Sequence, residues 1–136
     1  MAKLALMVGQ LRAGKEAERE GERTAIELRR RAGTRRAVGH REAAEEQRNA
    51  KLAYSRALAV AAASGGGVDD PTVVKLFADL QAEGDYRVLS RLFVAEEEAL
   101  GIQYSAEAAR REGKARKRAH QLTALATAAS FAETYG

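Results

Sequence analysis

The stretch 61–71, AAASGGGVDDP, holds three consecutive glycines and the only proline of the chain. Elsewhere proline is absent, so little else in the chain stops a helix once it has started. A glycine cluster followed by Asp and Pro is typical of one helix ending and another beginning. This stretch therefore divides the chain into two segments of similar length, each able to form one long helix.

The segment before the glycines carries small and apolar residues at a stride of eleven. That stride corresponds to about 3.67 residues per turn and keeps a stripe on one face of a nearly straight helix. The pattern predicts one helix over 3–63. The two runs with this stride are Gly21, Ala32, Ala43 and Tyr54, and Leu28, Gly39, Ala50 and Ala61.

The segment after the glycines begins with strong helix-start signals. Asp70 is a good N-cap and Pro71 a good first helical residue, so the turn spans 64–70, includes Gly65, Gly66 and Gly67, and precedes a helix over 71–134. A second stripe supports that helix: Val88, Leu92, Ala95, Ala99, Ile102, Ala106, Ala109, Gly113, His120, Ala124 and Phe131. Gly84-Asp85 is the one candidate kink or break; the alternative is a tolerated glycine inside a continuous helix.

Together these features predict an all-α fold, a long antiparallel helical hairpin that forms a single domain, 1–136. Each arm would be about 90 Å long at the standard helical rise. If the residue numbers of facing positions sum to about 134, opposite charges meet across the arms. In that register Glu18 faces Arg116 and Arg36 faces Glu98. Gly21 then faces Gly113, which allows close helix packing.

The composition limits what such a hairpin can bury. Alanine contributes 30 residues, tryptophan is absent and aromatic residues make up 5% of the chain. Large side chains supply most buried apolar area, so we expect the hairpin to pack with copies of itself into a helical oligomer, or against a larger assembly. Two apolar groups are the expected contact patches. They are the tip residues Val73, Val74, Leu76, Phe77 and Leu80, and the C-terminal residues Leu122, Leu125 and Phe131.

Residues for chemistry are sparse. The chain has no cysteine, and its SGGG sequence lacks the lysine and the preceding strand of a P-loop. His40 and His120 have neither HExxH spacing nor a Glu three residues before them. We therefore expect no catalytic residue, no metal site, no cofactor and no enzymatic activity. The apolar runs Leu4 to Val8 and Leu122 to Ala132 are too short to predict a secretory signal or a membrane span.

Two groups of basic residues that lie close together in the sequence are candidates for contact with DNA or with a channel lumen. They are Arg29, Arg30, Arg31 and Arg35 in the first segment, and Arg110, Arg111 and Lys114 in the second. Such clusters can neutralise phosphates. The alternatives are a solvated helix face or ion pairs between the arms. Acidic residues interleave with the first cluster and no aromatic residues offer stacking platforms, which weakens the nucleic-acid interpretation.

The core segment SRALAVAAASGGGVDDPTVVKLFAD is flanked by GERTAIELRRRAGTRRA and EAARREGKARKRAHQ, and the chain ends near YG. In these residues it resembles the small internal virion proteins of short-tailed bacteriophages, also called core or ejection proteins. The resemblance implies a place inside the virion, near the portal, tail or larger ejection proteins. It also implies release with the genome and a role in a conduit for DNA across the host envelope. The chain is richer in charge and poorer in Gln and Asn than that pattern.

Two other classes stay open. One is a basic helical nucleic-acid-binding protein, and the other is a scaffold or adaptor coiled coil with a different partner. Mass in solution and salt-dependent DNA binding distinguish these classes from a self-assembling structural subunit.

Overall fold

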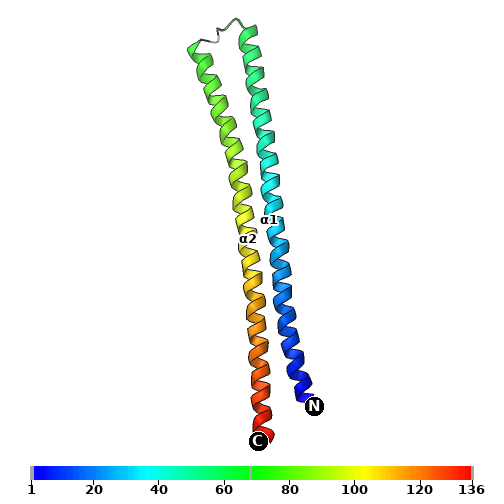
Figure 1. Cartoon of the computed structure of the whole chain (residues 1–136). Coiled ribbons are helices and arrows are strands. Elements are labelled where there is room, and N and C mark those ends of the chain that lie inside the picture. Colours follow the sequence, from blue (N-terminus) through cyan, green and yellow to red (C-terminus); the bar gives the residue numbers. More distant parts are fainter. Residues whose placement is uncertain (1, 68, 136) are drawn as a thin grey trace. The chain divides into compact units, whose positions relative to one another are not determined.

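The computed structural model describes residues 2–67 and 69–135, and side chains within 4–67 and 69–132. The chain forms two helices, α1 (Ala2–Ala63) and α2 (Pro71–Tyr135), which run antiparallel and pack against each other (Figure 1). No strand occurs in the described residues. The predicted all-α helical hairpin is confirmed. The helix α2 continues through Gly84 and Asp85, so the break considered there is absent.

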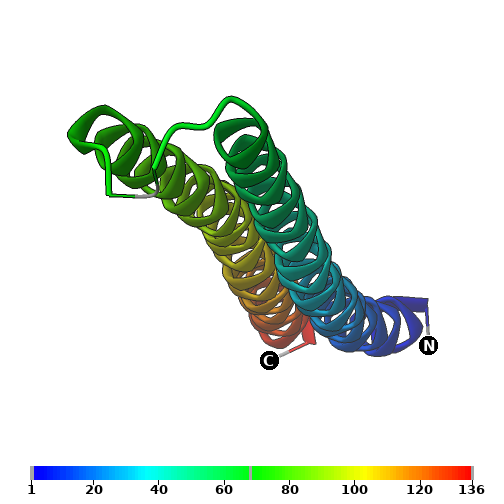
Figure 2. The same ribbon diagram turned by 90° about the horizontal axis from the view of Figure 1, so that it is seen from above.

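The turn between the helices (Figure 2) depends on the backbone conformation of one glycine and on an N-cap hydrogen bond. Gly65 follows the end of α1 with a φ of 72°, the left-handed conformation that favours glycine at a helix C-terminus. At the start of α2, Asp70 Oδ1 accepts a hydrogen bond of 2.8 Å from the amide of Thr72, so Asp70 is the N-cap of the helix that begins at Pro71. No contact fills the Cβ position of Gly67, and Gly66 meets only ordinary contacts. Val68 belongs to the expected turn but lies outside the described residues.

The contacts of the chain group into two compact units, each containing part of both helices. We call Met1–Ala32 with Leu100–Gly136 the terminal unit, and Gly33–Ala99 the turn unit. The expected single domain stays a prediction.

The interior of the terminal unit consists of alanine and glycine. Ala25, Ala32, Ala106 and Ala124 are 0–3% exposed. A Cβ placed on Gly21 would lie 2.8 Å from the carbonyl oxygen of Ala109 and 3.0 Å from the Cα of Gly113. At Gly21 and Gly113 the two helix backbones therefore approach each other too closely for either position to carry a side chain.

Alanine and glycine also fill most of the interior of the turn unit. Ala43, Ala95 and Ala99 are buried, and a Cβ on Gly39 would collide with the Cβ of Ala95. A Cβ on Gly84 would lie 2.7 Å from that of Ala50. The numbers of these facing residues sum to 134, as do those of Gly21 and Gly113 in the terminal unit.

Nearer the turn, one aromatic pair replaces the small residues. The rings of Tyr54 and Phe77 are 4.9 Å apart and tilted by 44°. Phe77 is only 8% exposed, so its expected role in an exposed contact patch is wrong. The neighbouring Val74 and Leu76 are each 52% exposed.

These interiors remove little apolar surface from water. The buried hydrophobic residues within the described part of the chain are seven alanines and Phe77. The accessible surface is 10161 Å², against about 6,900 Å² for a compact monomer of this mass. Since hydrophobic stabilisation scales with apolar area buried, the packing of α1 on α2 supplies only a small part of what a globular domain of this length obtains.

The glycine contacts lead to a direct test. Gly113→Ala improves helix propensity by about 1 kcal/mol but places a Cβ 2.9 Å from the carbonyl oxygen of Ala17 and 3.1 Å from the Cα of Gly21. Overpacking of this kind typically costs about 1–3 kcal/mol, so we expect a net loss of unfolding free energy. Gly101→Ala is the matched control on the same helix, because its Cβ meets nothing within 4 Å, and it should stabilise by up to about 1 kcal/mol. Urea unfolding followed by circular dichroism measures both variants at one protein concentration. Equal stabilisation by the two would contradict the close approach.

Candidate functional site

Ion pairs across the helices surround the small-residue interior of the turn unit. Arg36 donates two hydrogen bonds to Glu96, of 2.7 and 2.9 Å. Arg91 donates two to Glu46 Oε1, of 3.1 and 3.2 Å. A paired Arg-carboxylate contact of this type has a defined geometry, so these bonds help set how α1 and α2 align within the unit.

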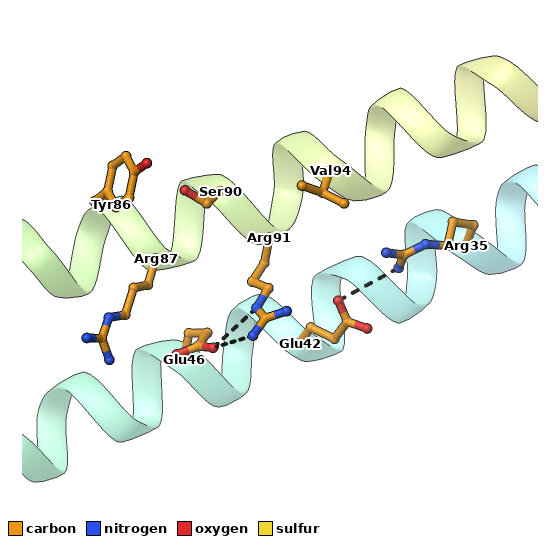
Figure 3. A pocket seen from close by; sticks show the side chains of 8 residues that line it. All are labelled: Arg35, Glu42, Glu46, Tyr86, Arg87, Ser90, Arg91 and Val94. Carbon is orange, nitrogen blue, oxygen red and sulfur yellow. Dashed lines mark hydrogen bonds and ion pairs between the residues drawn. The ribbon is translucent and has the colours of Figure 1, made fainter.

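A groove in the turn unit lies beside these pairs (Figure 3). Arg91 reaches across it to Glu46, and Nη1 of Arg35 lies 3.8 Å from Glu42. Arg35 also donates through Nε to Glu98. The charges that line the groove are largely paired with one another, so the groove presents no concentrated charge of one sign to a ligand.

In the terminal unit, an inter-helix ion pair joins Nζ of Lys117 to Oε2 of Glu18 at 2.5 Å. The hydrogen bond from Lys117 lowers the pKa of Glu18 below its ordinary value, and attraction from Lys117 and Lys114 adds to the effect while desolvation opposes it. Both side chains are about 30% exposed, so the pair is partly sheltered from solvent.

The carboxyl of Glu96 in the turn unit behaves in the same way. Its hydrogen bonds from Arg36 lower its pKa, attraction to Arg36 and His40 contributes, and desolvation opposes the shift. The same contact raises the pKa of Arg36, and the hydrogen bond to Glu98 raises the pKa of Arg35. The ionised partners therefore stabilise each other across the helices.

The residues proposed for DNA or lumen contact fall into two groups. Arg31 pairs with Glu27 on its own helix, Arg35 pairs with Glu98 and Glu42, and Arg111 lies 3.7 Å from Glu107. Arg30 also has an interaction partner. Arg29, Arg110 and Lys114 are exposed, and no ion pair joins them to another described residue. The predicted basic clusters are thus partly neutralised by their neighbours.

The inter-helix partners differ in detail from those expected. Glu18 pairs with Lys117 rather than Arg116, which binds Glu112 on its own helix. Arg36 pairs with Glu96, and Glu98 pairs with Arg35. The pair between Arg91 and Glu46 was missed. Searching for opposite charges whose numbers sum to between 132 and 137, instead of 134 alone, would have found all four contacts.

Side chains that could bind a metal ion do not cluster in the part of the chain that the structure describes. No cluster of three or more His, Cys, Asp or Glu side chains there is placed to hold a metal ion. His40 lies in the turn unit near Glu96, whereas His120 belongs to the terminal unit, where a Cβ placed on Gly14 would lie 3.1 Å from the Cβ of His120. Neither helix, over its described residues, contains a stretch apolar enough to cross a membrane.

No protein-family model, curated protein or solved structure matches this chain.

The lowered pKa values predict an acid-sensitive fold. Folded-state pKa values below the ordinary 4.5 mean that the Glu18 and Glu96 contacts stabilise the folded state fully above that pH and lose this contribution as the pH falls below it. In the variant Glu18→Gln/Glu96→Gln, the midpoint temperature of unfolding should fall less between pH 6 and pH 3 than it does in the wild type. These two pH values bracket the ordinary pKa range of carboxyl groups. Glu45→Gln is the control, because Glu45 is exposed and joins no ion pair with a described residue. An identical pH profile for wild type and double variant would contradict the role of these pairs.

Proposed function

We propose that this protein is a structural subunit that functions as a homo-oligomer, in the class of internal virion proteins that form part of a phage genome-ejection apparatus. The observation that carries the proposal is the composition of the interior. The hairpin buries seven alanines and one phenylalanine, while twenty large hydrophobic side chains among the described residues are exposed. Exposed apolar surface on this scale marks an interaction surface.

The physical properties of the hairpin suit passage with a genome. Low apolar burial makes the packing of α1 on α2 weak, so separating or unfolding the helices costs little free energy. A subunit with these properties can leave a virion through a narrow channel and reassemble with its copies beyond it. Neighbouring copies would then supply the buried surface that one chain lacks.

The charge pattern supports a role around DNA without base recognition. Arg29, Arg110 and Lys114 are exposed and join no ion pair with a described residue, while acidic side chains engage Arg31, Arg35 and Arg111. A channel surface with both positive and negative side chains attracts DNA at some points and repels it at others, so it does not bind DNA tightly. In the proposed assembly the virion is the location, and the portal, tail or larger ejection proteins and the host envelope are the further partners.

The nucleic-acid-binding alternative predicts a different result in a DNA-binding experiment. It requires tight binding of duplex DNA by the isolated protein, with an affinity that falls steeply as salt rises. It also requires that Arg29→Gln/Arg30→Gln/Arg31→Gln weaken that binding. A scaffold or adaptor, in turn, would stay monomeric until a second protein is added.

The proposal predicts the mass of the purified protein. Light scattering coupled to size exclusion should give a mass that is a multiple of 14.7 kDa, and negative-stain imaging should show rings, tubes or bundles of helices. The reason is that the exposed apolar residues of one copy need a second copy to cover them. A monomer at all accessible concentrations would end the proposal.

A further inference from the structure

One side of the terminal unit is built from both helices, and the ion pair between Glu18 and Lys117 marks it. Lys114 lies close enough to Glu18 to lower the pKa of that carboxyl, so it belongs to the same side. Helical residues three or four positions apart share one side of a helix. Steps of this size from the ion pair define a surface that we call the lysine face: Leu4, Val8, Leu11, Lys15 and Glu18 of α1, and Arg110, Lys114, Lys117, Gln121, Leu125 and Ala128 of α2.

A shallow apolar groove supports the alignment of these two rows of residues. The groove is lined by Leu4, Met7, Thr127, Ala128 and Phe131. Leu4 of α1 and Ala128 of α2 therefore lie at one groove, just as Glu18 and Lys117 lie at one ion pair. The two rows thus open on the same side of the terminal unit.

One half of the lysine face is apolar and exposed. Leu4, Val8, Leu11 and Leu125 are 52%, 43%, 39% and 66% exposed. They belong to the segments 4–11 and 119–132, neither of which contains Lys, Arg, Asp or Glu. The hairpin therefore leaves this half without an apolar cover and without charge.

The other half of the lysine face is basic. Lys15, Arg110 and Lys114 are exposed, and no ion pair joins them to another described residue. The acidic residue of this half, Glu18, is bound by Lys117. Glu112 lies two residues before Lys114, about 200° away around α2, so it does not offset this charge on the same side.

We propose that the lysine face of the terminal unit binds the surface of a lipid bilayer that carries net negative charge. The apolar half enters the boundary between headgroups and acyl chains, about 5–10 Å deep, through Leu4, Val8 and Leu125. The basic half stays among the lipid phosphates, which attract Lys15 and Lys114. Leu4 and Lys15 are about 17 Å apart along α1, so a tilted unit reaches both layers at once.

Other partners satisfy only one half of this face. Duplex DNA would neutralise the cations but leave the exposed leucines in water. The same face of a second copy would place lysines beside lysines if the copies were parallel, or beside leucines if they were antiparallel. Neither arrangement gives the lysines an anionic partner. An anionic bilayer offers apolar and anionic layers next to each other.

The lipid chemistry is inferred from these residues, whereas the host envelope as the source of the bilayer rests on the proposed function. The inference extends that function by naming a surface through which a subunit attaches to the envelope.

A tryptophan reporter tests the face, because the chain has no tryptophan of its own. The variant Leu125→Trp is mixed with vesicles of phosphatidylcholine and phosphatidylglycerol. We expect its fluorescence to increase and shift to shorter wavelength, and to change little with vesicles of phosphatidylcholine alone. Leu6→Trp is the matched control, because Leu6 is 59% exposed and lies two residues before Val8, on a different side of α1. Equal shifts for both variants would overturn the assignment to this face.

Removal of charge provides a second test. Lys15→Gln/Lys114→Gln should weaken binding to the anionic vesicles about 30-fold, measured by co-sedimentation, since each basic residue at such a surface adds a similar increment. Arg31→Gln/Arg116→Gln is the control with the same change in net charge, because each arginine pairs with a glutamate on its own helix. It should weaken binding far less. Equal losses for the two double variants would contradict the lysine face, and circular dichroism checks that each keeps its helix content.

The outcomes separate this inference from the proposed function. A wild type that is oligomeric but does not bind anionic vesicles overturns the inference and leaves the proposed function standing. A wild type that binds the vesicles but is monomeric at all accessible concentrations ends the proposed function and leaves the lysine face standing. Binding of duplex DNA without any binding of vesicles would overturn the lipid surface in favour of a nucleic acid.

Discussion

The close approach of α1 and α2 is the constraint on which the rest of the structure depends. Gly21 against Gly113 and Gly39 against Ala95 leave no room for a larger side chain at those positions. Backbones that lie this close make good van der Waals contact but bury small residues only. The hairpin therefore gains a definite register and little hydrophobic stabilisation. Most of its large apolar residues are consequently left at the surface, where Tyr86, Leu89 and Phe93 are 68%, 64% and 67% exposed.

The inter-helix ion pairs help to fix the alignment of α1 and α2 that the packed small residues allow. Stripes of alanine alone offer few distinct shapes, so a shift of one helix by one turn along the other would lose little packing. Arg36 with Glu96 and Lys117 with Glu18 penalise such a slip, because a shifted register would separate these partners. Exposed ion pairs contribute little to stability individually, so their role is the choice of alignment more than strength. Each unit thus has a defined alignment and a modest interior.

Much of this fold could be predicted from residue pattern, for identifiable reasons. The glycines at 65–67, Asp70 and Pro71 are local signals, and local chemistry determines where α1 ends and α2 begins. The stripe through Ala95, Ala106 and Gly113 predicted the packed face because helix geometry converts spacing into position. A single fixed register did not identify the ion-pair partners, since long side chains such as that of Arg36 reach a carboxylate in an adjacent turn. The burial of Phe77 was missed because it depends on the ring of Tyr54 from the other helix.

The small-residue interior links the structure to the proposed function, in which copies of the chain cover the apolar surface that one hairpin leaves exposed. The most direct test is thermal unfolding followed by circular dichroism over about a 100-fold range of protein concentration. If association supplies the missing burial, the unfolding midpoint rises steadily with concentration, because only the folded state binds its copies. A midpoint that does not change across that range would show that the single hairpin is stable alone, and would contradict the central claim.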